Sequence, residues 1–510
     1  MKYLLAHDLG TSGNKAVLYS EEGTLVKSAL APYPLIVRHS NWAEQDAGDW
    51  WRAVCDSTRQ LLEGIDPRDI AAVSFSGQMM GCLCVDRNGV PLRNALIWAD
   101  LRSADQEAAM RQRIDLWDYY RIAGHRISSA YGGYKLMWIR DWEPEVYRQT
   151  YRTLNAKDYI LYKLTGRFVT EYTDASSTGF WDLCRGRWSW ELLDLAGLDP
   201  DKMPEALPST AVCGVVTAQA GAETGLRPGT PVVCGGGDGA CAAVGAGSIR
   251  EGVANSCLGT SSWISLAARQ PLDDPSMRNM TWPHIVPGYY LPCGTMQCGG
   301  GSYNWFVDEL CGVEARQAQE SGQSRFDLVQ REAEAVPPGA RGLLYLPYLI
   351  GERSPRWNDK ARGAFIGLTL EHSRPEMARA VLEGVALNLN VILQSLQSCG
   401  CRPESIVLIG GGAKSALWRQ IFADVYRTPI RKPNVLEEAT SMGAAVTAGV
   451  GVGLFPDFTA VDRFLAIEEE LRPNEERALL YDRLKPLFED CYQQLEPTFA
   501  KLHDFATKGA

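Results

Sequence analysis

The hydrophobic positions of this chain form short apolar runs bounded by turn residues and longer stretches with helical spacing. Residues 3–6 and 16–19 are apolar runs that flank Leu9-Gly10-Thr11-Ser12, and residues 253–257 and 263–266 flank the same tetrapeptide at residues 258–261. Each pair predicts two strands joined by a tight turn. The recurrence suggests two related halves with a nucleotide held between two domains, although two ordinary hairpin turns would give the same pattern.

The rest of the first half alternates between predicted strands and helices. The turn at residues 21–23 leads into a strand at residues 24–30, which predicts an antiparallel three-stranded start. A helix is predicted from about Asp49, as its N-cap, to Gly64, as its stop. Residues 71–76 predict a strand whose end delivers Gln78 to a sheet edge, where α/β proteins bind ligands. Residues 102–207, rich in Trp, Tyr and Arg, predict helical insertions that shape a cleft.

The second half repeats this alternation with clearer helix signals. Ser373 and Glu376 have the spacing of a capping box ahead of a long helical pattern that runs to Leu396. An apolar strand at residues 406–409 leads into Gly410-Gly411-Gly412 and another helix, a combination typical of a phosphate or nucleotide turn. The charged residues from about 455 onward predict a helical tail.

The length of the chain indicates how many domains it has, and its charge excludes some classes of partner. A chain of 510 residues exceeds the size of one hydrophobic core, and we expect an N-terminal domain at 1–247, a C-terminal domain at 248–454 and a tail at 455–510 packed on the latter. The formal net charge of −10 argues against nucleic acid or an anionic membrane as partner. Apolar stretches fall short of the roughly 20 residues of a membrane helix, and Asp8 follows the start too closely for a signal peptide. A cytoplasmic location is therefore expected.

Asp238 is the strongest candidate for a catalytic base. It lies within the run Gly235-Gly236-Gly237-Asp238-Gly239, directly after the apolar residues 232–234. A carboxylate in hydrogen-bond reach of a sugar hydroxyl can accept its proton as the hydroxyl attacks a γ-phosphate. Glycines around it would let the phosphate and the acceptor approach the backbone. The alternative is an aspartate that caps a turn in a flexible loop.

Asp8 and the residues after it are the candidate phosphate and metal site. Asp8 ends the first apolar run and could hold Mg²⁺ through water, since Mg²⁺ keeps several waters and uses few protein carboxylates. The backbone of Gly10, Thr11 and Ser12 could approach phosphates. Lys15 could reach a phosphate oxygen, and the alternative for it is an exposed strand lysine.

Polar and apolar residues at two successive strand ends predict a sugar site. A polyol stacks its C–H faces on aromatic rings, while its hydroxyls need donors and acceptors. Methionine pairs are more often core residues, so Met79 and Met80 have that alternative. The candidate substrate-binding residues are Gln78, Met79, Met80, Trp98 and Asp100, together with Asp238.

Several motifs together resemble the FGGY carbohydrate kinases, and most closely the xylulokinases among them, over residues 3–453. Residues 363–368 (Gly-Ala-Phe-Ile-Gly-Leu), followed by Glu376-Met377 and by Ala-Val-Leu-Glu at residues 380–383, satisfy the C-terminal signature of that family. Further matching segments lie at residues 8–13, 76–79, 235–238, 346–355 and 410–419.

The resemblance implies an α/β fold of two ribonuclease H-like domains, as in actin and hexokinase, with ATP and sugar in an interdomain cleft. It implies Asp238 as the base and Asp8 near Mg²⁺ and substrate. Homodimers are common among such kinases, so the resemblance also implies a homodimer. The nucleotide-binding residues that it implies are Gly10, Thr11, Ser12, Gly259, Thr260, Gly300, Asn304, Gly411 and Gly412.

Three positions depart from the xylulokinase pattern. Met80 stands where xylulokinases usually have a histidine that contacts the ketose, and a thioether replaces a hydrogen-bonding imidazole poorly. Gly239 stands where they tend to have Asn, and Gly132 stands where the family usually has Pro, Ser or Thr. The expected reaction is ATP-dependent phosphorylation of a small sugar hydroxyl, with D-xylulose to D-xylulose 5-phosphate as the first hypothesis.

Three alternative functions remain open on these residues. Another FGGY kinase would act on gluconate, ribulose or another ketose or polyol. An actin-like ATPase would hydrolyse ATP without a sugar acceptor, which the Asp238 run and the Gln78, Trp98 and Asp100 cluster argue against. A sugar-binding regulator would lack catalysis, against which stand the intact Asp8, Asp238 and glycine loops.

Overall fold

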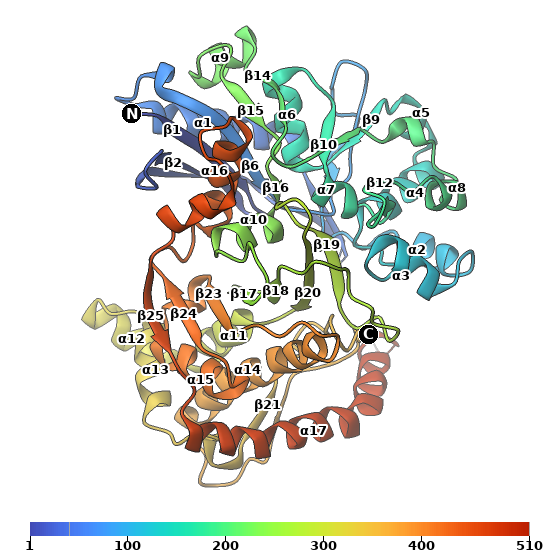
Figure 1. Cartoon of the computed structure of the whole chain (residues 1–510). Helices are drawn as coiled ribbons and strands as arrows, with labels where there is room; N and C mark the ends of the chain where they lie inside the picture. Colours follow the sequence, from blue (N-terminus) through green and yellow to red (C-terminus); the bar gives the residue numbers. More distant parts are fainter. Residues whose placement is uncertain (40, 509–510) are drawn as a thin grey trace. The chain divides into compact units, whose positions relative to one another are not determined.

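The computed structural model describes residues 1–39 and 41–508, and the chain divides into two compact units (Figure 1). The first comprises Met1–Arg250, Ala267–Leu291 and Glu438–Ala466, and the second comprises Glu251–Leu266, Pro292–Glu437 and the chain from Ile467 onward. The expected boundary at 247/248 lies close to the first change of unit. The expectation of consecutive domains misses the return of residues 438–466, which fold with the first unit.

The first unit is built on a mixed sheet. Its strands follow the order β14-β15-β6-β1-β2-β3, and the short β16 pairs with β6. β1 pairs antiparallel with β2 and parallel with β6, so the antiparallel start predicted from the sequence is confirmed. The bounds are β1 Tyr3–Leu9, β2 Gly13–Ser20, β3 Leu25–Pro32, β6 Ile70–Gly77, β14 Val212–Val215, β15 Pro231–Val233 and β16 Gly236–Gly237.

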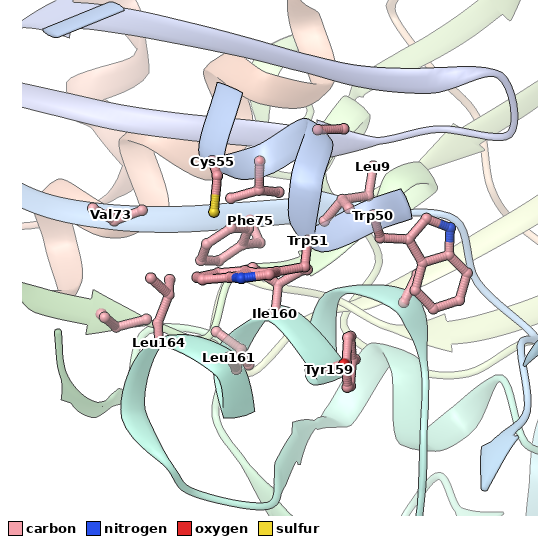
Figure 2. Packing of buried hydrophobic residues seen from close by; sticks show 14 of the residues in the cluster. Leu9, Trp50, Trp51, Cys55, Val73, Phe75, Tyr159, Ile160, Leu161 and Leu164 are labelled. Carbon is pink, nitrogen blue, oxygen red and sulfur yellow. The ribbon is translucent and has the colours of Figure 1, made fainter. Parts of the chain in front are cut away.

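Helix α1 (Ala47–Leu62) and helix α6 (Ala156–Thr165) supply much of the core of this unit. Side chains from α1, α6 and β6 converge there, including Trp50, Phe75 and Leu161 (Figure 2). Burying such a side chain stabilises the fold by about 1.5–3 kcal/mol. The predicted N-cap Asp49 is wrong, because the Asp46 side chain accepts from the Gly48 amide and Asp49 lies in the first turn.

The predicted helical insertion is present, interrupted by short strands. Its strands belong to small two-stranded sheets. Its elements are α2 Ala104–Arg111, α3 Leu116–Ala123, α4 Gly132–Trp142, α5 Pro144–Gln149, β9 Arg152–Leu154, β10 Val169–Glu171, α7 Tyr172–Ser176, β11 Trp181–Asp182, β12 Arg187–Trp188, α8 Trp190–Ala196 and β13 Glu205–Leu207.

Helices α10 (Asp238–Gly245) and α16 (Ala439–Gly451) of the first unit cross at two glycines. A Cβ on Gly245 would lie 1.9 Å from the carbonyl oxygen of Ala439, and a Cβ on Gly443 would lie 1.9 Å from that of Cys241. The two backbones therefore approach more closely than any other residue would allow. Because α10 starts at Asp238 and α16 carries Thr440, this crossing links two residues of the site described below.

The second unit repeats the pairing pattern of the first. β17 (Val253–Leu258) pairs antiparallel with β18 (Ser262–Leu266) and parallel with β23 (Ser405–Ile409). Both Leu-Gly-Thr-Ser segments thus form turns between antiparallel strands at corresponding places, as predicted. The strand order in this unit is β20-β18-β17-β23-β24-β25, with β20 Tyr290–Met296, β24 Ile430–Pro433 and β25 Ile467–Leu471.

The predicted capping box is confirmed at the start of α14 (Arg374–Ser398), between Ser373 and Glu376. The predicted all-helical tail is wrong at β25, which pairs antiparallel with β24 before α17 (Glu475–Lys508) begins. Arg431 and Glu470 face each other across those strands at 2.9 Å. The other helices of this unit are α11 Gly300–Leu310, α12 Gly312–Ser321, α13 Arg325–Glu334 and α15 Ala416–Tyr426.

Among the helices of the described chain, none combines the length and the apolar character that crossing a membrane requires.

Candidate active site

Three parallel strands of the first unit end side by side and present the candidate acid–base residues. Asp8 of β1 pairs in register with Ser76 of β6, and Ser76 pairs with Gly236 of β16. Two residues beyond Gly236, Asp238 begins helix α10. The strand ends therefore bring Asp8 and Asp238, 230 positions apart in sequence, into one region. This is the edge at which parallel sheets bind ligands.

The two carboxylate oxygens of Asp8 have different surroundings. Thr440 Oγ1 donates to Asp8 Oδ2 at 2.7 Å. Asp8 Oδ1 is buried and has no hydrogen-bond partner within the described residues. Burial raises the pKa of Asp8, and the hydrogen bond from Thr440 opposes that shift. A buried carboxylate oxygen without a partner is suited to a water, a hydroxyl or a hydrated cation.

Asp238 combines partial exposure with a strongly shifted pKa. Its Oδ1 accepts from the amide of Gly239 at 2.7 Å, and the side chain is half-buried. Burial and the nearby charge of Asp8 raise the pKa of Asp238 to about 7. A carboxylate with a pKa near neutrality binds a proton more strongly than an ordinary aspartate, so it is a better base.

The raised pKa predicts a pH-dependent stability that Asp238→Asn removes. A carboxyl whose folded pKa exceeds its unfolded value stabilises the fold below the unfolded pKa, and that contribution is lost as pH rises from about 4 to about 7. The asparagine stays neutral throughout. We expect Asp238→Asn to raise the free energy of unfolding, relative to wild type, more at pH 8 than at pH 5. Urea unfolding at both pH values measures this, and an equal difference at both would contradict it.

The glycines before Asp238 are needed for packing within the protein. Gly235 has a φ of +73°, and its Cβ would lie 1.8 Å from the carbonyl oxygen of Phe75. A Cβ on Gly237 would lie 2.5 Å from Cγ of Met79. These protein contacts require glycine at both positions, whereas the sequence suggested ligand approach as the reason. Within the run 235–239, only Gly239 has open space where a Cβ would be.

Gln78 and Trp98 lie on a hydrogen-bond network that fixes the first Gly-Thr loop. Gln78 Nε2 donates to Gln45 Oε1 at 2.7 Å, and Gln45 Nε2 donates to the Thr11 carbonyl at 2.6 Å. Trp98 Nε1 donates to Thr11 Oγ1 at 2.9 Å. Gln78 Oε1 is buried and lacks a partner among the described residues. Gln45 was missed because only the fold brings β5 (Trp42–Gln45) to this loop.

Met79 and Met80 occupy different environments. Met79 packs on Gly237, next to Asp238. Met80 has a φ of +66°, its amide donates to Ser177 Oγ at 3.0 Å, and its carbonyl accepts from Lys135 Nζ at 2.9 Å. A Cβ on Gly132 would lie 2.3 Å from the carbonyl oxygen of Gly81, so this loop explains why glycine replaces the usual Pro, Ser or Thr there.

Asp100 forms a buried ion pair with Arg102. Its carboxylate accepts from the Ala43 amide at 2.8 Å and from Arg102 Nη2 at 2.7 Å. Arg102 also contacts Glu44 at 2.8 Å and lies 3.9 Å above the Trp42 ring. The carboxylate of Asp100 therefore binds Arg102 and the Ala43 amide within the protein. The sequence had suggested that it contacts a sugar directly.

The remaining candidates of the first unit lie on the β1–β2 turn and near the start of β2. Tyr33 donates its hydroxyl proton to the Gly10 carbonyl at 2.5 Å, and its amide donates to the Ser12 carbonyl at 3.2 Å. Lys15 pairs with Asp8 in the β1–β2 register, and its Nζ contacts Glu438 at 2.6 Å. A phosphate would therefore compete with Glu438 for this ammonium group.

The nucleotide-binding candidates of the second unit line one cavity of about 550 Å³. The amide of Gly300 donates to the Gly259 carbonyl at 2.8 Å, which fastens the second Gly-Thr loop to the start of α11. The cavity also gathers residues that motif spacing could not reveal. The predicted members are Gly259, Thr260, Gly300, Asn304, Gly411 and Gly412, and the additional ones include Tyr303, Phe326, Asp327, Gln330, Lys414 and Ser415.

Comparison with known proteins decides what this arrangement belongs to. Residues 3–245 match the N-terminal domain of the FGGY family of carbohydrate kinases, and residues 254–452 match its C-terminal domain. The chain belongs to the FGGY family. It is thus a carbohydrate kinase with the two-domain, actin-like α/β fold of that family, and FGGY kinases use ATP.

Relatives of this FGGY kinase include enzymes of two specificities. A xylulose kinase of Staphylococcus epidermidis is 33% identical over 98% of both chains. A gluconokinase of Bacillus licheniformis is 31% identical over 99% of this chain and 98% of its own. The crystal structure of a xylulose kinase from Lactobacillus acidophilus superposes with a TM-score of 0.90 at 31% identity, over 98% of this chain and 100% of the other.

The carboxylate of Asp8 in the first unit suits a hard cation that the protein binds through few of its own ligands. Groups of three or more His, Cys, Asp or Glu side chains placed to hold a metal are absent from residues 1–39 and 41–508. Asp8 Oδ1 offers a single unpartnered carboxylate oxygen. Mg²⁺ usually binds through one or two carboxylates, several waters and substrate phosphates, so Asp8 fits that ion.

The cavity predicts a steric test of ATP binding at Gly411. Nothing lies within 4 Å of where its Cβ would be, and the residue lines the cavity. We expect Gly411→Leu to raise the KM for ATP on the order of tenfold or more, because the side chain would occupy ligand space. Gly312→Leu in α12 is the matched control, since that glycine is also open but lies outside the cavity. Equal KM values in both variants would contradict the assignment.

Proposed function

We propose that this FGGY kinase transfers the γ-phosphoryl group of ATP to D-xylulose, giving D-xylulose 5-phosphate. The observation that carries the proposal is Asp238, whose pKa is raised to about 7 beside Asp8 at the ends of three parallel strands. Asp238 accepts the proton of the primary hydroxyl as its oxygen attacks the γ-phosphorus, and ADP leaves.

The other residues bind and orient the reactants. Gly259, Thr260 and Gly411 line the cavity that would receive ATP. Asp8 would hold Mg²⁺ through water, and the bound ion would neutralise charge on the phosphates. Gln78 would offer its buried and unpartnered Oε1 to a sugar hydroxyl. Phosphoryl transfer depends mainly on such positioning and charge stabilisation.

Charge at the strand ends supports an uncharged acceptor. Asp8 and Asp238 place two carboxyls there, and Asp8 already shifts the pKa of Asp238. Three cations of this unit already have partners: Lys15 contacts Glu438, Lys135 donates to the carbonyls of Met80 and Ala130, and Arg102 pairs with Asp100 and Glu44. A gluconate carboxylate would add a like charge without a ready partner, whereas a ketose adds none.

A panel of acceptors tests the proposal. ADP release is measured with D-xylulose, D-ribulose, gluconate and glycerol, each at several concentrations, and without acceptor. We expect the highest kcat/KM with D-xylulose, by on the order of tenfold over gluconate, since loss of a few contacts or an unpaired charge has that effect. Full-rate ATP hydrolysis without acceptor would instead indicate an actin-like ATPase.

Gluconate is the second candidate acceptor. The Bacillus licheniformis relative is a gluconokinase, and Met80 departs from the histidine of xylulokinases. A higher kcat/KM with gluconate would overturn the xylulose proposal and leave the carbohydrate kinase assignment intact.

A further inference from the structure

Glu171 is a buried carboxylate near the glycine run before Asp238, and the proposed reaction does not use it. It ends β10 and is fully buried. Its Oε1 accepts from Thr173 Oγ1 at 2.6 Å and from the Asp174 amide at 2.9 Å. Its Oε2 accepts from the Thr173 amide and from Ser209 Oγ, each at 2.8 Å. Four donors therefore fix both oxygens.

Two of the residues that donate to Glu171 also accept hydrogen bonds from the glycine run before Asp238. Thr173 Oγ1 accepts from the Gly237 amide at 2.8 Å. The carbonyl of Ser209 accepts from the Gly235 amide at 3.0 Å. Gly237 is the residue directly before Asp238 and the N-cap of α10. Glu171 is thus connected to both ends of the segment 235–237, through Ser209 at Gly235 and through Thr173 at Gly237.

The direction of these hydrogen bonds makes the arrangement specific. A threonine hydroxyl has one proton, and Thr173 gives it to Glu171. Its oxygen is then free to accept, which matches the Gly237 N–H. A hydroxyl turned the other way would leave two donors facing each other.

A buried ammonium group holds Glu171 in place. Lys157 Nζ lies 3.3 Å from Glu171 Oε1, 2.8 Å from Asp158 Oδ1 and 2.9 Å from Asp174 Oδ2, and all four side chains are buried. Removing one partner of such a cluster leaves an uncompensated buried charge. Buried hydrogen bonds and ion pairs of this kind are suited to support a catalytic loop.

We propose that Glu171 is a positioning residue that acts through Thr173 and Ser209 to fix the Gly237–Asp238 segment for proton transfer. The inference rests on the proposed function, in which Asp238 is the base. Thr173 transmits the constraint, since its hydroxyl connects the Glu171 carboxylate to the amide that precedes the base.

The test compares Thr173→Val with Thr173→Ser. Valine keeps the shape and removes the hydroxyl, whereas serine keeps the hydroxyl. We expect Thr173→Val to lower kcat on the order of 10- to 100-fold with little change in the KM for ATP, and to shift the acid limb of the pH profile of kcat/KM. Thr173→Ser should keep most of the wild-type kcat and its pH profile. A Thr173→Val enzyme with wild-type kcat, or two variants equally impaired, would overturn the proposal.

A double-mutant cycle separates this proposal from the role of Asp238. If Thr173 acts through Asp238, Thr173→Val should leave the residual rate of Asp238→Asn unchanged, because interacting residues are not additive. If Thr173→Val lowers kcat by the same factor in the wild type and in Asp238→Asn, the positioning role is refuted. Wild-type activity in Asp238→Asn alone would refute the base itself. If Thr173→Val fails to fold, Ser209→Ala replaces it in the cycle, with a smaller loss of kcat expected because the Ser209 carbonyl still holds Gly235.

Discussion

Asp238→Asn is expected to lower the turnover of sugar phosphorylation on the order of 10² to 10⁴, the contribution of a positioned general base. Asparagine has the same shape but cannot accept the hydroxyl proton. ATP binding should persist, because the cavity that would hold the nucleotide is lined by residues of the second unit. Coupled ADP release measures kcat, and a nucleotide-binding titration measures affinity. Unchanged turnover would remove Asp238 from the mechanism.

The pH profile gives an independent reading of the same residue. Asp238 must be deprotonated to act, so kcat/KM for the sugar should rise as pH increases through about 7 in the wild type. The residual activity of Asp238→Asn should lack this limb. An aspartate with an ordinary pKa would give a profile flat from pH 5 upward, which would contradict the raised value. Asp8 contributes to the shift, so Asp8→Asn should move the limb to lower pH.

Gly443→Ala is expected to cause a large loss of stability from a single added methyl group. Its Cβ would lie 1.9 Å from the Cys241 carbonyl oxygen, so α10 and α16 must separate. Overpacking of this kind costs about 1–3 kcal/mol, and more where backbone resists movement. Chemical unfolding measures the loss. Because the displaced helices carry Asp238 and Thr440, kcat should fall as well.

Gly239→Ala is the control for the helix crossing. Gly239 lies on α10, and nothing is within 4 Å of where its Cβ would be. Alanine there should leave the free energy of unfolding unchanged or raise it by roughly 0.5–1 kcal/mol, since glycine loses more backbone entropy on folding. Similar losses in both variants would contradict the assignment of the Gly443→Ala loss to the close contact between α10 and α16.

The sequence by itself determined those features that local patterns encode. The repeated turn at Gly10 and Gly259, the capping box at Ser373 and the strand–glycine turn at Gly410 depend on residues a few positions apart. Steric and hydrogen-bond preferences of neighbouring residues are sufficient to specify such elements. The FGGY motifs extended this local information to the family and the fold class.

Only the tertiary structure decided what the candidate residues contact. Asp100 is engaged by Arg102 and Ala43, Gly235 is needed because Phe75 lies against it, and Thr440 reaches Asp8 from the far end of the chain. Glu171 gave no signal in the sequence, because its role depends on the amides of a segment more than sixty residues away. Contacts between distant segments follow from how the whole chain packs, and local spacing cannot encode them.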